Sequence, residues 1–110
     1  MSDRFTSSMH VKREEAAWGS LAWFSSPAVS NARNLVVIEV TLNPAGAHSF
    51  HKHPKQEEVI YVLEGEIEEW VDGEKRTLRS GDSAFIAADV VHASFNLSDR
   101  EARYRDALHR

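Results

Sequence analysis

The amino-acid sequence predicts a single all-β domain in the form of a small sandwich or barrel. The chain has 110 residues, which is enough for one hydrophobic core but too few for two. Short apolar or alternating runs recur at intervals of roughly ten residues, a spacing typical of sandwiches and barrels. Turn-forming residues separate these runs, and no long segment has the apolar period of an amphipathic helix. We therefore expect about nine short strands.

The elements are expected in the following order. Residues 1–15 are polar and lack an apolar period, so we predict a flexible N-terminal arm ahead of a single domain over residues 16–110. The one helical candidate is short and spans residues 13–18. The predicted strands are residues 18–24, 35–42, 49–53, 58–63, 67–71, 75–78, 83–87, 92–97 and 102–108.

Turn residues justify the strand boundaries. Asn43 and Pro44 end the β-branched run over residues 35–42. Asp72 and Gly73 form a dipeptide that favours a two-residue hairpin turn between neighbouring strands.

Two of the predicted strands are apolar on both faces. In residues 58–63, Ile60 and Val62 alternate with Val59 and Tyr61, and residues 35–42 behave similarly. A sheet with one face in water would alternate apolar and polar residues, so the outer face of these strands should be covered. The N-terminal segment, a second sheet or another subunit could supply the cover, and we predict a homodimer.

Composition and charge exclude several classes of protein. The chain has 13 basic and 17 acidic residues and a net charge of −4, which argues against a nucleic-acid partner. It has no cysteine, so disulfide bonds and thiolate ligands are excluded. No apolar run approaches the ~18 residues of a membrane span, and the first residues lack the apolar core of a secretory signal. We expect a cytoplasmic location and no membrane partner.

Histidine and glutamate side chains suggest a metal site. His51 and His53 lie two residues apart in a predicted strand, so both rings project from one face. Glu58 begins the next strand in register with Ile60 and Val62, which turns its side chain inward, where a charge needs a partner. Two imidazoles and a carboxylate that converge on one face can bind a metal ion. The alternative is a polar hairpin edge with Glu58 in water.

Two motifs carry a family resemblance. The first runs from Gly46 to Gly65 as G-AHSF-HKH-PKQE-E-VIYVLE-G, and the second from Gly81 to Asn96 as G-DSAFI-AAD-VV-H-ASF-N. From residue 35 to residue 108 the chain resembles the cupin superfamily. The first cupin motif reads G, five residues, HxH, three or four residues, E, six residues, G, and this chain is one residue short after Gly46. The second reads G, five residues, PxG, two residues, H, three residues, N.

The resemblance implies a double-stranded β-helix, a small jelly-roll barrel, with a metal ion inside. By position in the motifs, the metal ligands are His51, His53, Glu58 and His92. Three neutral imidazoles and one carboxylate suit one divalent ion of Fe, Mn, Ni, Co or Zn. Glu57 also fits the shorter spacing of the first motif, but the six-residue gap to the following glycine favours Glu58.

Two positions depart from the second motif. Ala87 replaces its proline and Asp89 replaces its glycine. Aspartate is one of the few residues that tolerate a positive φ, so we expect the turn to survive and the metal site to stay intact.

Other residues are candidates for the pocket. His48 precedes the histidine pair by three residues and is expected on the opposite face of its strand, although it could also line the site. Asn96 either forms hydrogen bonds within the barrel or ends its strand. Phe85 and Tyr104 are candidate inward-facing aromatic residues of the pocket.

Glu69 is a candidate catalytic residue. In residues 66–71, Ile67 and Val71 should face inward, and the residue between them on that face is Glu69, where a valine would be usual. Its carboxylate could act as a base or as a polar contact for the ligand. In the alternative, a slipped register leaves Glu69 in water and buries Trp70.

The ligand set suits a metal-dependent enzyme that acts on a small organic substrate. Dioxygenase chemistry is the first hypothesis, by analogy with the fold and ligands of the family. A non-catalytic module that binds a metal or a small molecule is the alternative. The open ring of ligands argues against a purely structural metal site.

Overall fold

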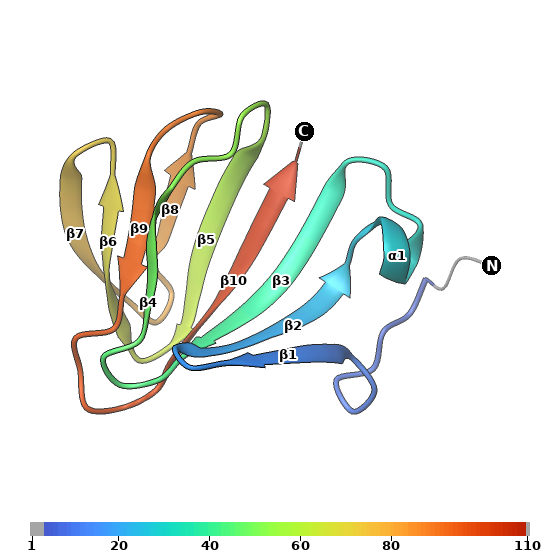
Figure 1. The fold of residues 1–110 in the computed structure, drawn as a ribbon, viewed down its shortest axis with the longest axis horizontal. Coiled ribbons are helices and arrows are strands. Elements are labelled where there is room, and N and C mark those ends of the chain that lie inside the picture. Colours follow the sequence, from blue (N-terminus) through green and yellow to red (C-terminus); the bar gives the residue numbers. More distant parts are fainter. Residues whose placement is uncertain (1–3, 110) are drawn as a thin grey trace.

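Two β-sheets face each other in the computed structural model, which describes residues 4–109 (Figure 1). The six-stranded sheet has the order β1-β2-β3-β10-β5-β8, and the four-stranded sheet has the order β4-β9-β6-β7. The elements are β1 (Lys12–Ala16), β2 (Gly19–Ser25), α1 (Pro27–Ser30), β3 (Leu35–Leu42), β4 (Ala47–His51), β5 (Glu57–Glu64), β6 (Glu66–Val71), β7 (Glu74–Arg79), β8 (Ser83–Ile86), β9 (His92–Phe95) and β10 (Ala102–His109). Strand β10 lies between β3 and β5, and β9 between β4 and β6, as in a jelly roll. The predicted all-β barrel is confirmed.

Each of the nine predicted strands has a counterpart in β2 to β10, but the N-terminal part differs from the prediction. The helix expected over residues 13–18 is wrong, and residues 12–15 of the expected arm belong to strand β1. Every residue of β1 is exposed, and the strand pairs with β2 from Lys12–Trp23 to Ala16–Gly19. Because β1 pairs through its backbone and buries no side chain, its sequence has no alternating apolar pattern from which the strand could be predicted. The flexibility of the arm and the domain boundary stay predictions.

The short helix α1 was also not predicted. Ser26 caps it by accepting a hydrogen bond from the Val29 N–H at 3.2 Å, and Pro27 occupies its first turn. No helix within residues 4–109 is long and apolar enough to span a bilayer. The cytoplasmic location stays a prediction.

The hydrophobic core lies between the two sheets. It is formed by alternate residues of the facing strands, namely Ile38, Val40, Leu42, Ile60, Val62, Ile67, Leu78, Ile86, Ala102, Tyr104 and Leu108. The same alternation carries three carboxyl groups inward. Glu58 of β5 and Glu69 of β6 are each 2% exposed, and Asp106 of β10 is 5% exposed. The barrel therefore encloses acidic groups within an aliphatic interior.

The outer face of the six-stranded sheet exposes apolar side chains. Val59 lies opposite Phe85 of β8 and Ala107 of β10. The inward placement expected for Phe85 is wrong, since its side chain is 58% exposed, although Phe85 does line a cavity beside β8. Strand β8 instead turns Ala84 and Ile86 toward the interior.

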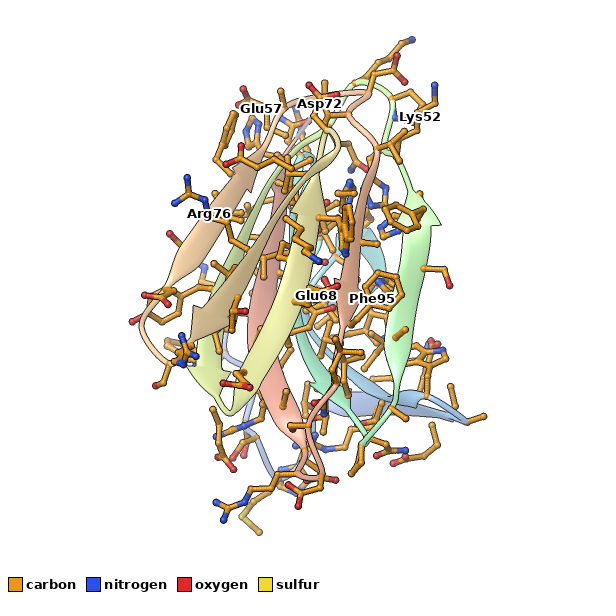
Figure 2. The ribbon with its side chains drawn as sticks, turned by 90° about the vertical axis from the view of Figure 1, so that its left-hand side faces the viewer. Lys52, Glu57, Glu68, Asp72, Arg76 and Phe95 are labelled. Carbon is orange, nitrogen blue, oxygen red and sulfur yellow. The ribbon has the colours of Figure 1, made fainter. Side chains whose placement is uncertain are left out.

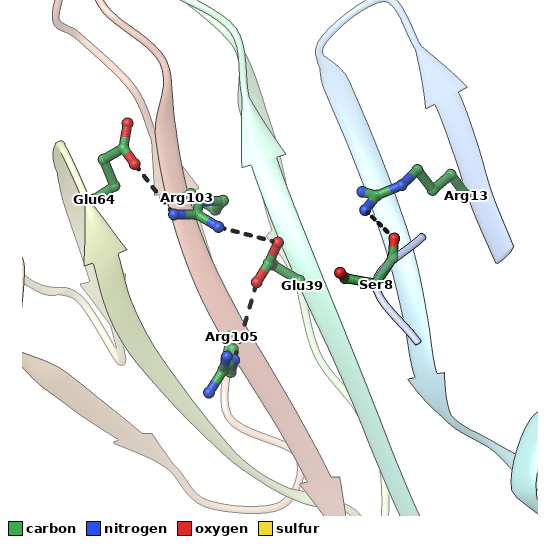
Figure 3. Close-up of polar contacts among 6 residues, drawn as sticks. All are labelled: Ser8, Arg13, Glu39, Glu64, Arg103 and Arg105. Atoms are coloured by element: carbon green, nitrogen blue, oxygen red, sulfur yellow. Dashed lines mark hydrogen bonds and ion pairs between the residues drawn. The ribbon is translucent and has the colours of Figure 1, made fainter. Parts of the chain in front are cut away.

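Charged side chains share this outer face. Arg103 of β10 contacts Glu64 of β5 at 3.1 Å and Glu39 of β3 at 3.5 Å, so one guanidinium bridges three strands (Figure 3). Next to the N-terminal segment, Arg13 donates a hydrogen bond to the Ser8 carbonyl at 3.2 Å. The outer face thus carries both apolar and charged side chains, and strand β5 has apolar residues on both faces, as expected. The homodimer inferred from this pattern stays a prediction.

Two turns with positive φ hold the strands in place. Asp89 has a φ of 66°, so the expectation that it replaces the glycine of the second motif is confirmed. Its N–H donates to the His53 carbonyl at 3.0 Å, and its carboxylate lies 3.3 Å from Lys52 Nζ. Gly65, between β5 and β6, has a φ of 77°. A Cβ atom at Gly65 would lie 2.7 Å from the Glu101 carbonyl oxygen.

The substitution Gly65→Ala should destabilise the fold more than Gly73→Ala. Both place alanine in the left-handed region, which costs roughly 1–2 kcal/mol. Gly73 has open space around its Cβ position, whereas Gly65→Ala also forces Cβ against a backbone oxygen and adds about 1–3 kcal/mol. Urea denaturation of both variants measures the difference in unfolding free energy, and equal losses would contradict this close approach.

Candidate metal centre

Three histidine side chains meet at one end of the barrel interior. His51 ends β4, His53 follows in the next loop, and His92 begins β9. His51 and His92 lie directly opposite each other in the β4–β9 pair. One ring nitrogen of each of the three histidines lies within 4.8 Å of the others. Residues that are distant in the sequence thus form a single cluster with metal-ligand chemistry.

Glu58 adjoins this cluster from the facing sheet. Its Oε1 atom lies 2.9 Å from His92 Nε2 and 3.5 Å from His53 Nε2. Glu57, the other candidate, is exposed (Figure 2). The structure therefore brings together the four residues named from the motifs and leaves Glu57 outside.

The ring nitrogens are oriented by backbone carbonyl groups. His92 Nδ1 lies 2.9 Å from the Val90 oxygen, and His51 Nδ1 lies 2.5 Å from the Ser49 oxygen. A proton on each Nδ1 satisfies these contacts and leaves the lone pair on Nε2, as is usual for metal-binding histidines.

Two buried polar atoms at the cluster lack a partner. Among the described residues, neither His92 Nε2 nor Glu58 Oε1 has a hydrogen bond of suitable geometry. Buried polar atoms are normally paired, and each unpaired one is costly. A divalent cation between these atoms would satisfy both, because both can donate electron pairs. The donor set therefore fits a metal ion.

The pKa values of Glu58 and His53 also suit a cation. Burial opposes the charged form of Glu58, but its contacts with His92 and Asp106 outweigh burial and lower its pKa to about 2. Burial lowers the pKa of His53, which keeps that ring neutral. Burial would also lower the pKa of His92, but its 2.9 Å contact with the Glu58 carboxylate raises it, so a bound cation would replace the proton that this ring otherwise attracts. Glu58 is thus ionised, as a metal ligand must be.

Asp106 is a member of the site that the sequence reading missed. Burial and the Glu58 carboxylate raise the pKa of Asp106 to about 10, so it is protonated at neutral pH. It can therefore donate the side-chain hydrogen bond that it shares with Glu58. The signal was present in the sequence, because the alternation of β10 puts Asp106 on the same face as Tyr104.

The family of the chain can now be stated. A model of the cupin domain family matches residues 38–108, which include both motifs and all four clustered side chains. The chain is a cupin. Its jelly-roll barrel and its histidine cluster, which could hold a metal ion, agree with that family.

Two curated proteins and a solved structure are similar to this cupin. Polyketide synthase CurC of Streptomyces cyaneus is 34% identical over 85 residues, which are 77% of this chain and 55% of CurC. Protein SchB of Streptomyces halstedii is 32% identical over 77% of this chain and 62% of its own length. The cupin thus spans little more than half of these relatives. A solved RmlC-like cupin from Shewanella frigidimarina has a TM-score of 0.85 over 98% of this chain and 91% of that chain, at 22% identity, and shows the shared fold.

His48 lies beside the cluster, contrary to its expected position on the opposite face. Strand β4 pairs His48 with Ser94 and His51 with His92, so three steps on β4 match two on β9. The extra residue is a β-bulge, which reverses the alternation and turns His48 to the same face as His51. The ring centroids of His48 and His51 are 4.9 Å apart. A bulge leaves no clear sequence signal, which explains the error.

Glu69 points into the barrel, as its predicted register required. Its strand pairs Glu69 with Ser94 and Val71 with His92. Ser94 Oγ donates a hydrogen bond to Glu69 Oε1 at 2.5 Å, while Oε2 is buried without a partner among the described residues. The slipped register is wrong, because the Trp70 ring packs against Phe50 on the outer face.

The remaining pocket candidates have structural roles. The Asn96 amide donates to the carbonyls of Leu42, Asn43 and Arg100 at 3.1, 3.2 and 2.7 Å, so it closes the end of the barrel. Tyr104 faces inward, as expected, and is fully buried in the core. Its place in a ligand pocket stays a prediction.

The substitution Glu69→Gln should flatten the pH dependence of stability between pH 5 and 8. Burial is the main reason that the pKa of Glu69 rises from 4.5 to about 8, with Glu58 adding to the rise and Ser94 and His92 opposing it. The folded state therefore holds a proton on Glu69 that the unfolded chain releases, and this group alone lowers stability by up to ~1.4 kcal/mol per pH unit as the pH rises through this window. Asp106 adds a slope of the same sign, which Glu69→Gln leaves in place. Urea denaturation in EDTA measures the slope.

Glu68→Gln is the matched control, since Glu68 lies on the outer face of the same strand beside Phe95 (Figure 2). Its slope should equal that of the wild type. A Glu69→Gln slope equal to the wild-type slope would show that the Glu69 carboxyl is ionised across this range.

Proposed function

We propose that this cupin binds one divalent metal ion through His51, His53, Glu58 and His92 and acts on a small organic substrate. One observation carries the proposal: two buried atoms, Glu58 Oε1 and His92 Nε2, lie 2.9 Å apart without hydrogen-bond partners. One ring nitrogen of each of the three histidines lies within 4.8 Å of the others, and Glu58 contacts two of these rings. Imidazole and carboxylate ligands suit Fe, Mn, Ni, Co or Zn.

The protein residues fix the charge and orientation of this centre. Glu58 contributes the single negative charge, and Asp106 donates a hydrogen bond that holds its carboxylate in place. The Val90 carbonyl orients the His92 ring. When bound, the metal would supply Lewis-acid or redox chemistry. If the ion is six-coordinate, four protein donors leave coordination positions open for a substrate.

Oxidative chemistry of the dioxygenase type is the reaction that we propose to test first. A neutral-imidazole and carboxylate site suits iron and oxygen chemistry, and the absence of thiolate ligands is compatible with it. The name of the relative CurC refers to polyketide synthesis, the chemistry of molecules with several carbonyl groups, and supports diketones as test substrates. The alternative is a module that binds a metal or a small molecule without turnover.

The metal ligands are tested by substitution. His51→Ala, His92→Ala and Glu58→Gln should each reduce metal content at least tenfold from about one ion per chain, because each removes a donor. Glu57→Gln and His109→Ala are the controls and should retain the metal. Elemental analysis of protein purified without metal-chelating resin measures the content. Unchanged metal in both histidine variants would rule out this ligand set.

Turnover separates the enzyme from the binding module. Protein loaded with Fe(II) should consume oxygen when given a diketone, a catechol or a thiol from a panel, and His92→Ala should not. An oxygen electrode measures the rate. Tight metal binding with no consumption on any member of the panel would favour the module.

A further inference from the structure

A band of apolar side chains crosses the outer face of the six-stranded sheet. The strand register places Val37 of β3, Ala107 of β10, Val59 of β5 and Phe85 of β8 side by side. Val59 and Phe85 are 42% and 58% exposed, and Tyr61, two residues further along β5, is 44% exposed. Contiguous exposed apolar patches rimmed by charged residues are typical of surfaces that bind another protein.

The two central strands of this face carry opposite charges. The outward side chains of β10 include Arg103 and Arg105, and those of β5 include Glu57 and Glu64. Arg103 contacts Glu64 at 3.1 Å, so the positive and the negative strand lie directly side by side (Figure 3). Glu39 of β3 lies on the other side of β10 and contacts both guanidinium groups, at 3.5 and 4.0 Å. The charges thus alternate in sign from β3 to β10 to β5.

This alternation makes the face complementary to itself. A two-fold axis that lies along the face, between β10 and β5 and parallel to both, lays β10 of each copy on β5 of the other. Arg103 then faces the partner's Glu64, and Ala107 faces the partner's Val59, because the register pairs these residues across the axis. An axis across the strands would lay β10 on the partner's β10 and bring groups of like charge together, which is unfavourable. Charge therefore selects the first arrangement.

The face is large enough for a reversible dimer. Strands β3, β10 and β5 have eight residues each, and β8 has four. At ~4.8 Å between strands and ~3.3 Å per residue, these strands cover roughly 450 Å² in projection. Their protruding side chains raise the accessible area towards the ~600 Å² per partner of weak interfaces, which is below the ~800 Å² of a standard one. We therefore expect association that is lost on dilution.

We propose that two copies of this chain associate through the outer face of the six-stranded sheet, with β10 of each copy packed on β5 of the other. The apolar band forms the centre of the interface, and the charges of β10 and β5 set its orientation. The histidine cluster lies on the inner side of the same sheet, next to the inward side chain of Glu58. The dimer therefore does not depend on the metal centre proposed above.

Sedimentation equilibrium of the full-length chain tests whether a dimer forms. Between about 1 μM and about 1 mM protein, the mass should rise from that of one chain, 12.4 kDa, towards twice that value. The buffer contains EDTA, so that bound metal ions do not contribute to the result. The mass of one chain at every concentration, or an assembly of more than two chains, would overturn the proposal.

A lysine on each sheet locates the interface. Val59→Lys should weaken the dimer at least tenfold, because each copy then places an unpaired charge in the apolar centre. Phe50→Lys is the matched control, since Phe50 is 54% exposed and packs against Trp70 on the outer face of the other sheet. This control should dimerise like the wild type. A dimer that is lost in Phe50→Lys and kept in Val59→Lys would place the interface on the other sheet and overturn the proposal.

Two charge-reversed chains test the orientation. The acidic chain carries Arg103→Glu and Arg105→Glu on β10, and the basic chain carries Glu57→Lys and Glu64→Lys on β5. Each alone should dimerise at least fivefold more weakly than the wild type, because like charges then face each other across the axis. An equimolar mixture should recover the affinity, since β10 of each chain again meets the opposite charge on β5 of the other.

The acidic chain also distinguishes the two possible axes. If β10 lay on the partner's β10, the acidic chain would dimerise as the wild type does, and this result would overturn the proposed arrangement. Failure of the mixture to recover would overturn it as well. Circular dichroism checks that each variant folds. Phe85→Lys replaces Val59→Lys if the latter does not fold, because Phe85 lies in the same apolar band on the edge strand β8.

Discussion

The candidate centre depends on one constraint, the burial of the Glu58 carboxylate inside an apolar barrel. An unpaired charge in such a place costs several kcal/mol, and removing one partner of a buried pair typically costs about 3–5 kcal/mol. His53 and His92 lie at 3.5 and 2.9 Å from one of its oxygens, and Asp106 shares a hydrogen bond with it. Two imidazoles and a neutral acid thus surround a single negative charge. A bound cation would stabilise this arrangement further, because the negative charge of Glu58 attracts it.

The two ends of the barrel are built for different tasks. At the metal end, the turn at Asp89 bonds to the His53 carbonyl, and the Val90 carbonyl orients His92, so two loops position each other's ligands. At the opposite end, Asn96 binds the backbone of neighbouring loops and Gly65 allows two chain segments to approach closely. The end with Asn96 and Gly65 therefore holds the strands together, and the end with the histidine cluster carries the candidate metal ligands.

Alternation of inward and outward residues made most of the fold and site predictable. It correctly placed Glu58 and Glu69 inside, because burial on one face of a strand leaves a period of two in the sequence. It failed where that period breaks or is absent. The bulge in β4 turned His48 inward, and the exposed strand β1 pairs through its backbone alone. Asp106 followed the period but was overlooked among apolar neighbours.

Glu69 differs from Glu58 in how its burial is compensated. Glu58 is surrounded by imidazoles. Glu69 instead accepts one hydrogen bond, from Ser94, and keeps its other oxygen without a partner among the described residues. A valine at this position would remove the desolvation cost of a carboxyl group and leave only the Ser94 hydroxyl to be satisfied. As a structural element alone, Glu69 is therefore a poor choice. Its side chain also lines the cavity between the β6–β7 hairpin and β8, so this costly carboxyl group lies at the edge of a cavity and not within the packed aliphatic core.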